Sequence, residues 1–182
     1  DAFVYEDFTP EQLDALKGPA GPQGKSNVIY KRISAFPPTP ITGTTSRTPL
    51  SIIPLAGLGL TVGSFFDIKE FVERTVKAVG GVYQLWLHDS DNLAVGTPVQ
   101  IGIFTITANT GWIPFRRHYS IQAGNLLTGY PFGTSAINDS AIVTNVPSKT
   151  SIVDKTHIIS TITPNTLSDT AQSLDVLMLG EA

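Results

Sequence analysis

The sequence predicts a mainly β fold, an antiparallel sandwich or jelly-roll-like head with one amphipathic helix. Charged residues make up 15% of the 182 residues, below the roughly 25% that is typical of soluble domains. Thr, Ser, Gly, Pro and β-branched residues take their place. From Gly81 onward, short alternating apolar segments are separated by turn signals. Both observations indicate strands joined by turns, with a polar but weakly charged surface.

The overall charge and the cysteine content exclude several classes of protein. A formal net charge of −3 gives no general electrostatic attraction to nucleic acid or to an anionic membrane. The chain has no cysteine, which excludes disulfides, thiolate zinc sites and cysteine nucleophiles. No apolar run is long enough to span a bilayer. We therefore expect no nucleic-acid partner and no membrane insertion.

Residues 1–17 predict an attachment segment that contains a short helix. Thr9 is a good N-cap, Pro10 suits the first helical position, and Gln12 completes a capping box. Gly18 then ends the helix. A helix this short is marginal alone, so we expect its apolar neighbours to pack on partner copies or on a larger particle. These anchoring residues are Phe3, Val4, Tyr5, Phe8, Leu13 and Leu16.

Residues 18–26 predict a collagen-like neck. Gly18, Gly21 and Gly24 recur at every third position, and proline follows two of them. Three polyproline II chains can wind together only where the residue nearest the axis has no side chain. So short a tract would hold only between flanking segments of three identical chains, which predicts a homotrimer. A solvated Gly/Pro linker has the same composition, but three glycines in register favour the collagen-like interpretation.

The stretch from Phe8 to Gly24, FTPEQLDALKGPAGPQG, resembles the leader of many bacteriophage fibre proteins. In those proteins a short helix runs into collagen triplets and then into a β-rich trimeric head. The resemblance covers residues 1–26 and implies a structural virion component, a head fibre or tail fibre, on the virion surface. It also implies that the N-terminal end attaches to a capsid or tail protein. The C-terminal end is then expected to contact a bacterial surface glycan or protein.

The remaining chain divides into a connecting segment and the head. Residues 27–49 predict an extended linker, with a strand at Asn27–Ser34 and a Pro-, Thr- and Ser-rich continuation. Residues 50–182 predict the head domain. Leu50–Val62 is strongly apolar, but its proline and two glycines are incompatible with a regular helix. A buried strand, or a segment packed at a threefold axis, fits this stretch better.

Residues 67–79 predict the one amphipathic helix of the head. Asp67 is a possible N-cap with Glu70 three residues later, and the pair Gly80-Gly81 would end the helix. Apolar residues recur on one helical face. They are Ile68, Phe71, Val72, Val76 and Val79. We expect this helix to lie over a sheet.

Strand and turn signals occupy the rest of the head. The predicted strands are Val82–Leu87, Val99–Thr107, Trp112–Ile121, Ala141–Val146, His157–Thr163 and Ser173–Leu179. The predicted turns are 89–92, 109–111, 129–131, 138–140 and 164–165. Short strands at this spacing suggest an antiparallel sandwich or a jelly-roll-like head.

Aromatic and basic residues gather between Trp112 and Tyr119. Such a patch could stack on a sugar ring, hold an acidic glycan or engage single-stranded nucleic acid. Alternatively, the alternate aromatics enter the core while the arginines pair across a subunit interface. Aromatics at a spacing of two are ordinary in sheet cores, which favours this second interpretation. The recognition candidates are Trp112, Arg116, Arg117 and Tyr119, with Tyr130 and Phe132 in a predicted loop over 129–140.

No catalytic, metal or cofactor site is expected. The chain has no G-x-S-x-G motif, and its three histidines define no recognisable triad. The segment His88–Asn92 could hold a hard cation, but its composition is more typical of a polar turn. A collagen-necked ligand resembling complement-like or tumour-necrosis-factor-like trimers is an alternative to the fibre. A polysaccharide depolymerase is a third hypothesis, disfavoured because acidic residues are few.

Overall fold

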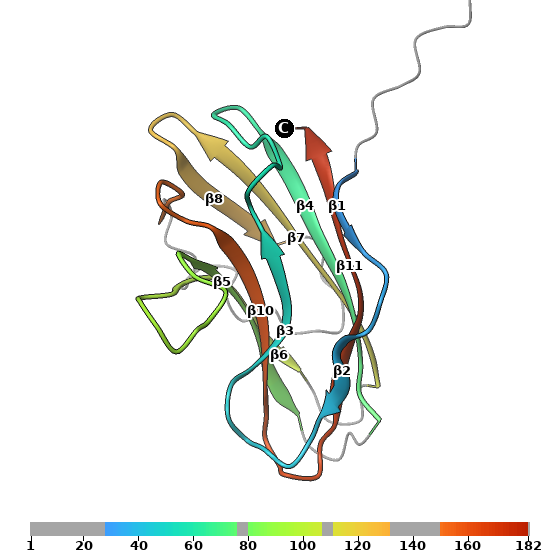
Figure 1. The fold of residues 1–182 in the computed structure, drawn as a ribbon. Helices are drawn as coiled ribbons and strands as arrows, with labels where there is room; N and C mark the ends of the chain where they lie inside the picture. Colours follow the sequence, from blue (N-terminus) through green and yellow to red (C-terminus); the bar gives the residue numbers. More distant parts are fainter. Residues whose placement is uncertain (1–27, 76–79, 107–110, 132–149, 182) are drawn as a thin grey trace, which may run out of the picture.

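The computed structural model describes residues 28–75, 80–106, 111–131 and 150–181, and every helix or strand assigned in these ranges is a β-strand (Figure 1). In chain order they are β1 (Val28–Arg32), β2 (Phe36–Ile41), β3 (Thr48–Pro54), β4 (Phe65–Glu73), β5 (Gly81–His88), β6 (Val99–Ile106), β7 (Trp112–Gln122), β8 (Leu126–Pro131), β9 (Thr150–Ser151), β10 (His157–Pro164) and β11 (Ala171–Glu181).

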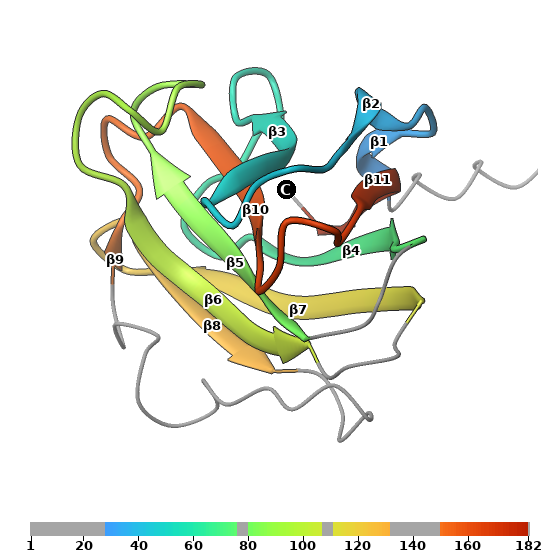
Figure 2. The same ribbon diagram turned by 90° about the horizontal axis from the view of Figure 1, so that it is seen from below.

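These strands form two antiparallel sheets. Sheet A has the order β1-β11-β4-β7-β8-β9, with β2 also paired to β11, and sheet B has the order β3-β10-β5-β6. Figures 1 and 2 show the sheets as two layers that face each other. The predicted mainly β, antiparallel class is therefore confirmed. No helix in the described ranges is long and apolar enough to cross a membrane.

The hydrophobic core lies between the two sheets. Along β4 and β7 every second side chain is buried, so one face of sheet A is apolar. The rings of Tyr83 on β5 and Phe115 on β7 stack across the two layers, with their centroids 3.7 Å apart. Phe104 on β6 packs beside both rings, 5.6 Å from Tyr83 and 5.2 Å from Phe115. Aromatic contacts thus join the sheets at the centre of the fold.

A carboxyl group is buried next to this aromatic cluster. The Glu70 side chain on β4 is 2% exposed, and the Tyr83 hydroxyl donates a 2.5 Å hydrogen bond to its Oε2. The hydroxyls of Ser51 and Ser160, 2.7 Å apart, face it from sheet B. Burial raises the pKa of Glu70, and the hydrogen bonds, led by that with Ser173, only partly offset this effect.

A buried ion pair connects the end of β4 to the turn before β11. Arg74 Nη2 lies 2.6 Å from Asp169 Oδ2, and both side chains are 1% exposed. Because a buried charge without its counter-charge is costly, the pair fixes these two segments relative to each other.

The prediction of a helix over 67–79 is wrong. Residues 65–73 form β4, a central strand of sheet A between β11 and β7, and residues 76–79 lie outside the described ranges. Buried and partly exposed residues alternate along β4 with a period of two, and the buried ones are Phe66, Ile68, Glu70 and Val72. Phe71, counted on the same helical face, points instead to the opposite side of the sheet from Val72. The backbone hydrogen bonds of β4 to β11 and β7 outweigh the helix-capping signal of Asp67 and Glu70.

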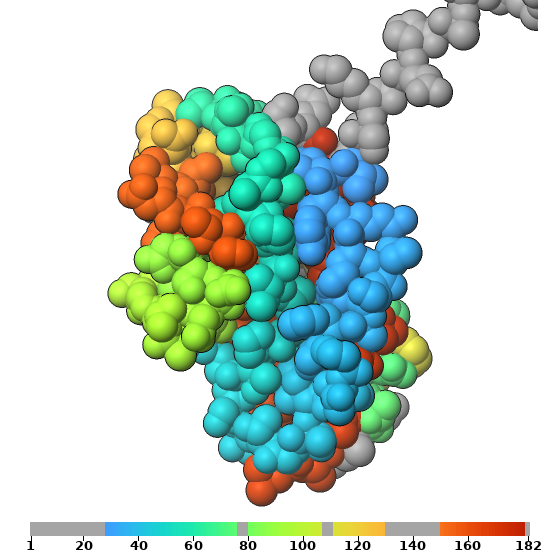
Figure 3. Space-filling view, in the orientation of Figure 1, coloured from blue at the N-terminus to red at the C-terminus, as the bar shows by residue number. Residues whose placement is uncertain are grey.

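The segment 27–49 is integrated into the sheet more than predicted. The strand expected at its start is confirmed as β1, but β2 and the beginning of β3 replace the expected linker. Both β1 and β2 pair with β11. Prolines are tolerated in β2 because it pairs on one side only. Figure 3 shows β1, β2 and β3 together on one continuous face of the molecule.

Most of the other strand predictions are confirmed. The predicted strands within 82–87, 99–106, 112–121, 157–163 and 173–179 coincide with β5, β6, β7, β10 and β11. The predicted turn at 129–131 is wrong, because these residues continue β8 along β7. The predicted strand Ala141–Val146, the N-terminal helix and the collagen-like neck lie outside the described residues.

Candidate functional site

The outward face of sheet A carries a row of cationic side chains. The strand registers place Lys31 on β1, Leu177 on β11, Lys69 on β4 and Arg116 on β7 opposite one another. Residues opposite one another in antiparallel strands share a face. The buried neighbours of these residues along each strand point to the core, so the row faces away from sheet B.

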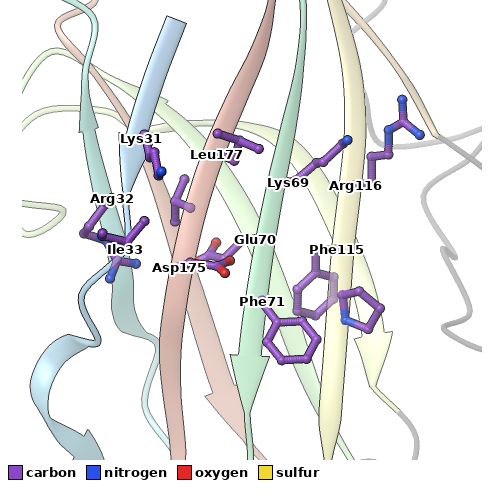
Figure 4. Close-up of a pocket in the computed structure, with 12 residues that line it drawn as sticks. Lys31, Arg32, Ile33, Lys69, Glu70, Phe71, Phe115, Arg116, Asp175 and Leu177 are labelled. Atoms are coloured by element: carbon purple, nitrogen blue, oxygen red, sulfur yellow. The ribbon is translucent and has the colours of Figure 1, made fainter. Parts of the chain in front are cut away.

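A groove of about 530 Å³ runs over this row, between β1 and β7. We call it the outer groove. Figure 4 shows side chains that line it: Lys31 on β1, Asp175 and Leu177 on β11, and Lys69 and Phe71 on β4. Pro114 and Arg116 of β7 complete it on the far side. The groove is open and lined by side chains of both charge signs, so it can accept a polar ligand from solvent.

An aromatic pair, half-buried Phe71 and exposed Trp112, lies at the border of the outer groove. The rings of Phe71 and Trp112 stack with centroids 5.4 Å apart and an interplanar angle of 25°. The register sets Phe71 opposite Pro114 and Glu73 opposite Trp112, which makes the two aromatics diagonal neighbours. Trp112 remains 57% exposed. A large apolar surface is therefore held rigidly in solvent at the rim of the groove.

An ion-pair cluster fixes the β7 wall of the groove. Arg116 Nε donates a 2.8 Å hydrogen bond to Asp67 Oδ2, and His118 Nδ1 lies 2.8 Å from Asp67 Oδ1. Burial alone would raise the pKa of Asp67, but the hydrogen bonds and charges of Arg116 and His118 outweigh it and lower that pKa. The charge of Arg116 is thus largely committed to Asp67.

The charges nearer β1 are available to a ligand. Within the ranges that the structure describes, the ammonium groups of Lys31 and Lys69 form no ion pair, and neither does the Asp175 carboxylate. Arg32 differs, because its guanidinium donates hydrogen bonds to the Ser34 carbonyl and the Ser173 hydroxyl. The two lysines are therefore the cations that a ligand could pair with at least cost.

Two of the predicted recognition residues lie in the interior. Arg117 is 1% exposed and Tyr119 is 0% exposed, so the prediction that they recognise a surface ligand is wrong. Strand alternation turns odd-numbered residues of β7 inward. The Arg117 guanidinium lies 5.4 Å from the Phe104 ring centroid, and the Tyr119 hydroxyl donates a 3.1 Å hydrogen bond to the Ile101 carbonyl.

The other predicted recognition residues lie in different parts of the chain, and two of them face outward from sheet A. Trp112 and Arg116 lie on the outward face, as a recognition role requires, although Arg116 pairs within its own chain. Tyr130 belongs to β8, and Phe132 lies outside the described residues, as do all the anchoring residues and neck glycines. The alternative interpretation is confirmed in one respect, because Phe115 and Tyr119 enter the core.

The sequence reasoning missed the rest of the outer groove. The sequence pattern places Lys69 and Phe71 in the predicted helix, and Lys31 in the predicted strand of the connecting segment. A signal that could have found them is the alternation Asp67, Lys69, Phe71, which is the outward face of β4.

The segment His88–Asn92 forms a polar bend after β5, as predicted. His88 is buried, its Nε2 lies 3.1 Å from the Asn92 carbonyl, and its Nδ1 accepts a 2.9 Å hydrogen bond from the Asp89 amide. Across the described residues, no three His, Asp or Glu side chains are grouped so that they could hold a metal ion. We take the outer groove, rather than this bend, as the candidate ligand site.

No protein-family model matches the chain, and no curated protein sequence matches it.

Proposed function

We propose that the protein is a structural fibre of a bacteriophage virion that adheres to bacterial surface glycan. Residues 1–17 anchor it to a capsid or tail protein, and residues 18–26 form a collagen-like neck that joins three identical chains. The β-rich head, jelly-roll-like in the proposal, is displayed outward from the virion surface. The role is adhesive and requires no catalysis.

The observation that carries the adhesive part is the stacked pair of Phe71 and Trp112 beside an open groove. Exposed aromatic faces on a rigid sheet are suited to stacking against the apolar faces of sugar rings. The virion part is supported by the leader Phe8–Gly24. Three heads on each fibre, and many fibres on each particle, convert modest affinity per groove into strong attachment.

Attachment to cells tests the adhesive role. The fluorescently labelled full chain is incubated with a panel of bacterial strains, and the bound fraction is measured after sedimentation. Trp112→Ala is expected to reduce attachment by at least about fivefold, because it removes the more exposed ring of the stacked pair. Val153→Ala is the matched control, since Val153 is an exposed apolar residue that does not line the groove. Attachment to none of the strains, or equal attachment by Trp112→Ala, refutes the proposal.

Light scattering tests the assembly. The full chain should have three times the chain mass of 19.5 kDa, and its thermal midpoint should rise with protein concentration. Gly21→Val places a side chain where three chains meet and is expected to reduce the trimer fraction. A monomer at all concentrations contradicts the trimeric fibre.

A further inference from the structure

We propose that the outer groove binds a polysaccharide that carries anionic groups on its sugar rings. In this arrangement Lys31 and Lys69 hold the charges, and the Phe71–Trp112 pair holds a ring. The inference rests on the adhesive role proposed above and adds the chemical class of the ligand.

The first step is the local charge of the groove. Arg116 is neutralised by Asp67, whereas Lys31 and Lys69 have no ion-pair partner in the described part of the chain. These two cations face one available carboxylate, that of Asp175. The whole chain has a net charge of −3, so a polyanion is not attracted by a general positive field. Binding of a polyanion therefore depends on local cations such as the two lysines of this groove.

The second step is the spacing of the two lysines. Lys31 lies on β1 and Lys69 on β4, with β11 between them, and the register sets them in one row. Neighbouring strands are about 4.8 Å apart, so the two backbone positions are about 10 Å apart. This span is comparable to the length of a disaccharide. A polysaccharide that lies across the strands and carries an anionic group on alternate rings would therefore match the spacing of the two ammonium groups.

The third step is the chemistry between and beside the charges. Leu177 lies between the two lysines in the row and provides an apolar floor. Phe71 and Trp112 offer aromatic faces for the apolar side of a sugar ring. The Asp175 carboxylate is opposite Phe71 in the register and can accept hydrogen bonds from sugar hydroxyls. Apolar floor, aromatic wall, acceptor and paired cations together fit an acidic saccharide.

The affinity of the full chain for defined oligosaccharides tests the ligand class. Two acidic probes, a hyaluronan hexasaccharide and a hexagalacturonate, are compared with neutral chitohexaose by isothermal titration calorimetry. At least one acidic probe is expected to bind about fivefold or more tightly than the neutral probe in about 50 mM NaCl. Raising NaCl to about 0.5 M should remove most of that preference, because salt screens exposed charges.

Charge-removing variants assign the effect to the groove. Lys31→Gln and Lys69→Gln should each weaken binding of the acidic probe by about two- to fivefold and leave chitohexaose binding unchanged. Lys155→Gln makes the same change in charge at a lysine that does not line the groove, and it should leave both affinities unchanged. Trp112→Ala should weaken acidic and neutral probes alike.

Each of three results would overturn the inference. In the first, neither acidic probe binds more tightly than chitohexaose, and in the second, Lys31→Gln and Lys69→Gln behave like Lys155→Gln. In the third, hexadeoxythymidylate binds as tightly as the acidic probes. The last result would indicate a nucleic-acid ligand. In each case the adhesive role still stands if Trp112→Ala reduces attachment to cells. It falls if the unaltered chain attaches to none of the strains, or if that variant attaches to cells like the unaltered chain.

Discussion

Replacing Glu70 by Gln is expected to remove a pH dependence of folding stability that is built into the core. The carboxyl group is 2% exposed between the sheets, and burial raises its pKa above the ordinary value of 4.5. A group with a raised pKa in the folded state contributes its full stability below the unfolded pKa. That contribution is lost as pH rises through the folded pKa.

The magnitude follows from one linked proton. Between the unfolded and folded pKa values of Glu70, the free energy of unfolding should fall by up to about 1.4 kcal/mol per pH unit. Glutamine cannot ionise, but its amide oxygen can still accept the hydrogen bond from Tyr83. The variant should therefore match the unaltered chain near pH 4.5 and become the more stable of the two at higher pH.

Urea unfolding followed by tryptophan fluorescence, from about pH 4.5 to 8, measures this difference. Other titrating groups contribute to both curves, so the difference between them isolates Glu70. Glu73→Gln removes a carboxylate from the outward side of the same strand and serves as the matched control. If the curves for Glu70→Gln and the unaltered chain run parallel, Glu70 does not have a raised pKa and the reasoning is wrong.

Three further predictions concern stability. Asp169→Asn should lower the free energy of unfolding by about 3–5 kcal/mol in urea unfolding, because it removes the counter-charge that Asp169 supplies to the buried Arg74 guanidinium. The double variant Arg74→Met, Asp169→Leu should recover most of the loss. Asp67→Asn should cost about 1 kcal/mol or less at pH 7, since the ion pair is partly exposed. Because the pKa of Asp67 is lowered in the folded state, its contribution to the free energy of unfolding is present above the unfolded pKa and lost as pH falls. The stabilities of Asp67→Asn and the unaltered chain should therefore converge in acid unfolding curves. Gly129→Ala should cost about 1–3 kcal/mol and lower the thermal midpoint in calorimetry, because a Cβ atom there would lie 2.7 Å from the buried ring of Tyr119.

Two of the strands that the sequence predicted correctly share a simple pattern. In β7, and in the first half of β5, buried positions alternate with half-buried or exposed ones. Such segments follow directly from the period of two. The mainly β class was therefore within reach of composition and spacing alone.

Two of the mistakes have a common physical cause, which is a charged residue on the inward side of a strand. Glu70 occupies a core position of β4, so the apolar alternation of that strand is broken and a helical spacing with a capping signal takes its place. In β7, Arg117 is buried while Arg116 is outward, and composition does not distinguish the two. The partners that these side chains meet in the core, among them Tyr83 for the acid and the ring of Phe104 for the base, account for their burial.

The outer groove could be predicted only in part for a similar reason. Trp112 and Arg116 were identified from their local clustering, but Lys31 and Lys69 are distant in sequence and are brought into one row by the register of three strands. Register between non-consecutive strands such as β1 and β11 depends on tertiary packing. No local pattern encodes it.

The position of β1 has a mechanical consequence. This strand is where the described chain enters the fold, and its Lys31 is also one wall of the outer groove. A force applied between a ligand in the groove and the chain that precedes β1 would first load the hydrogen-bond ladder between β1 and β11. The layer of sheet B lies off that path of force. We expect this ladder to be the first part of the fold to yield under such a load.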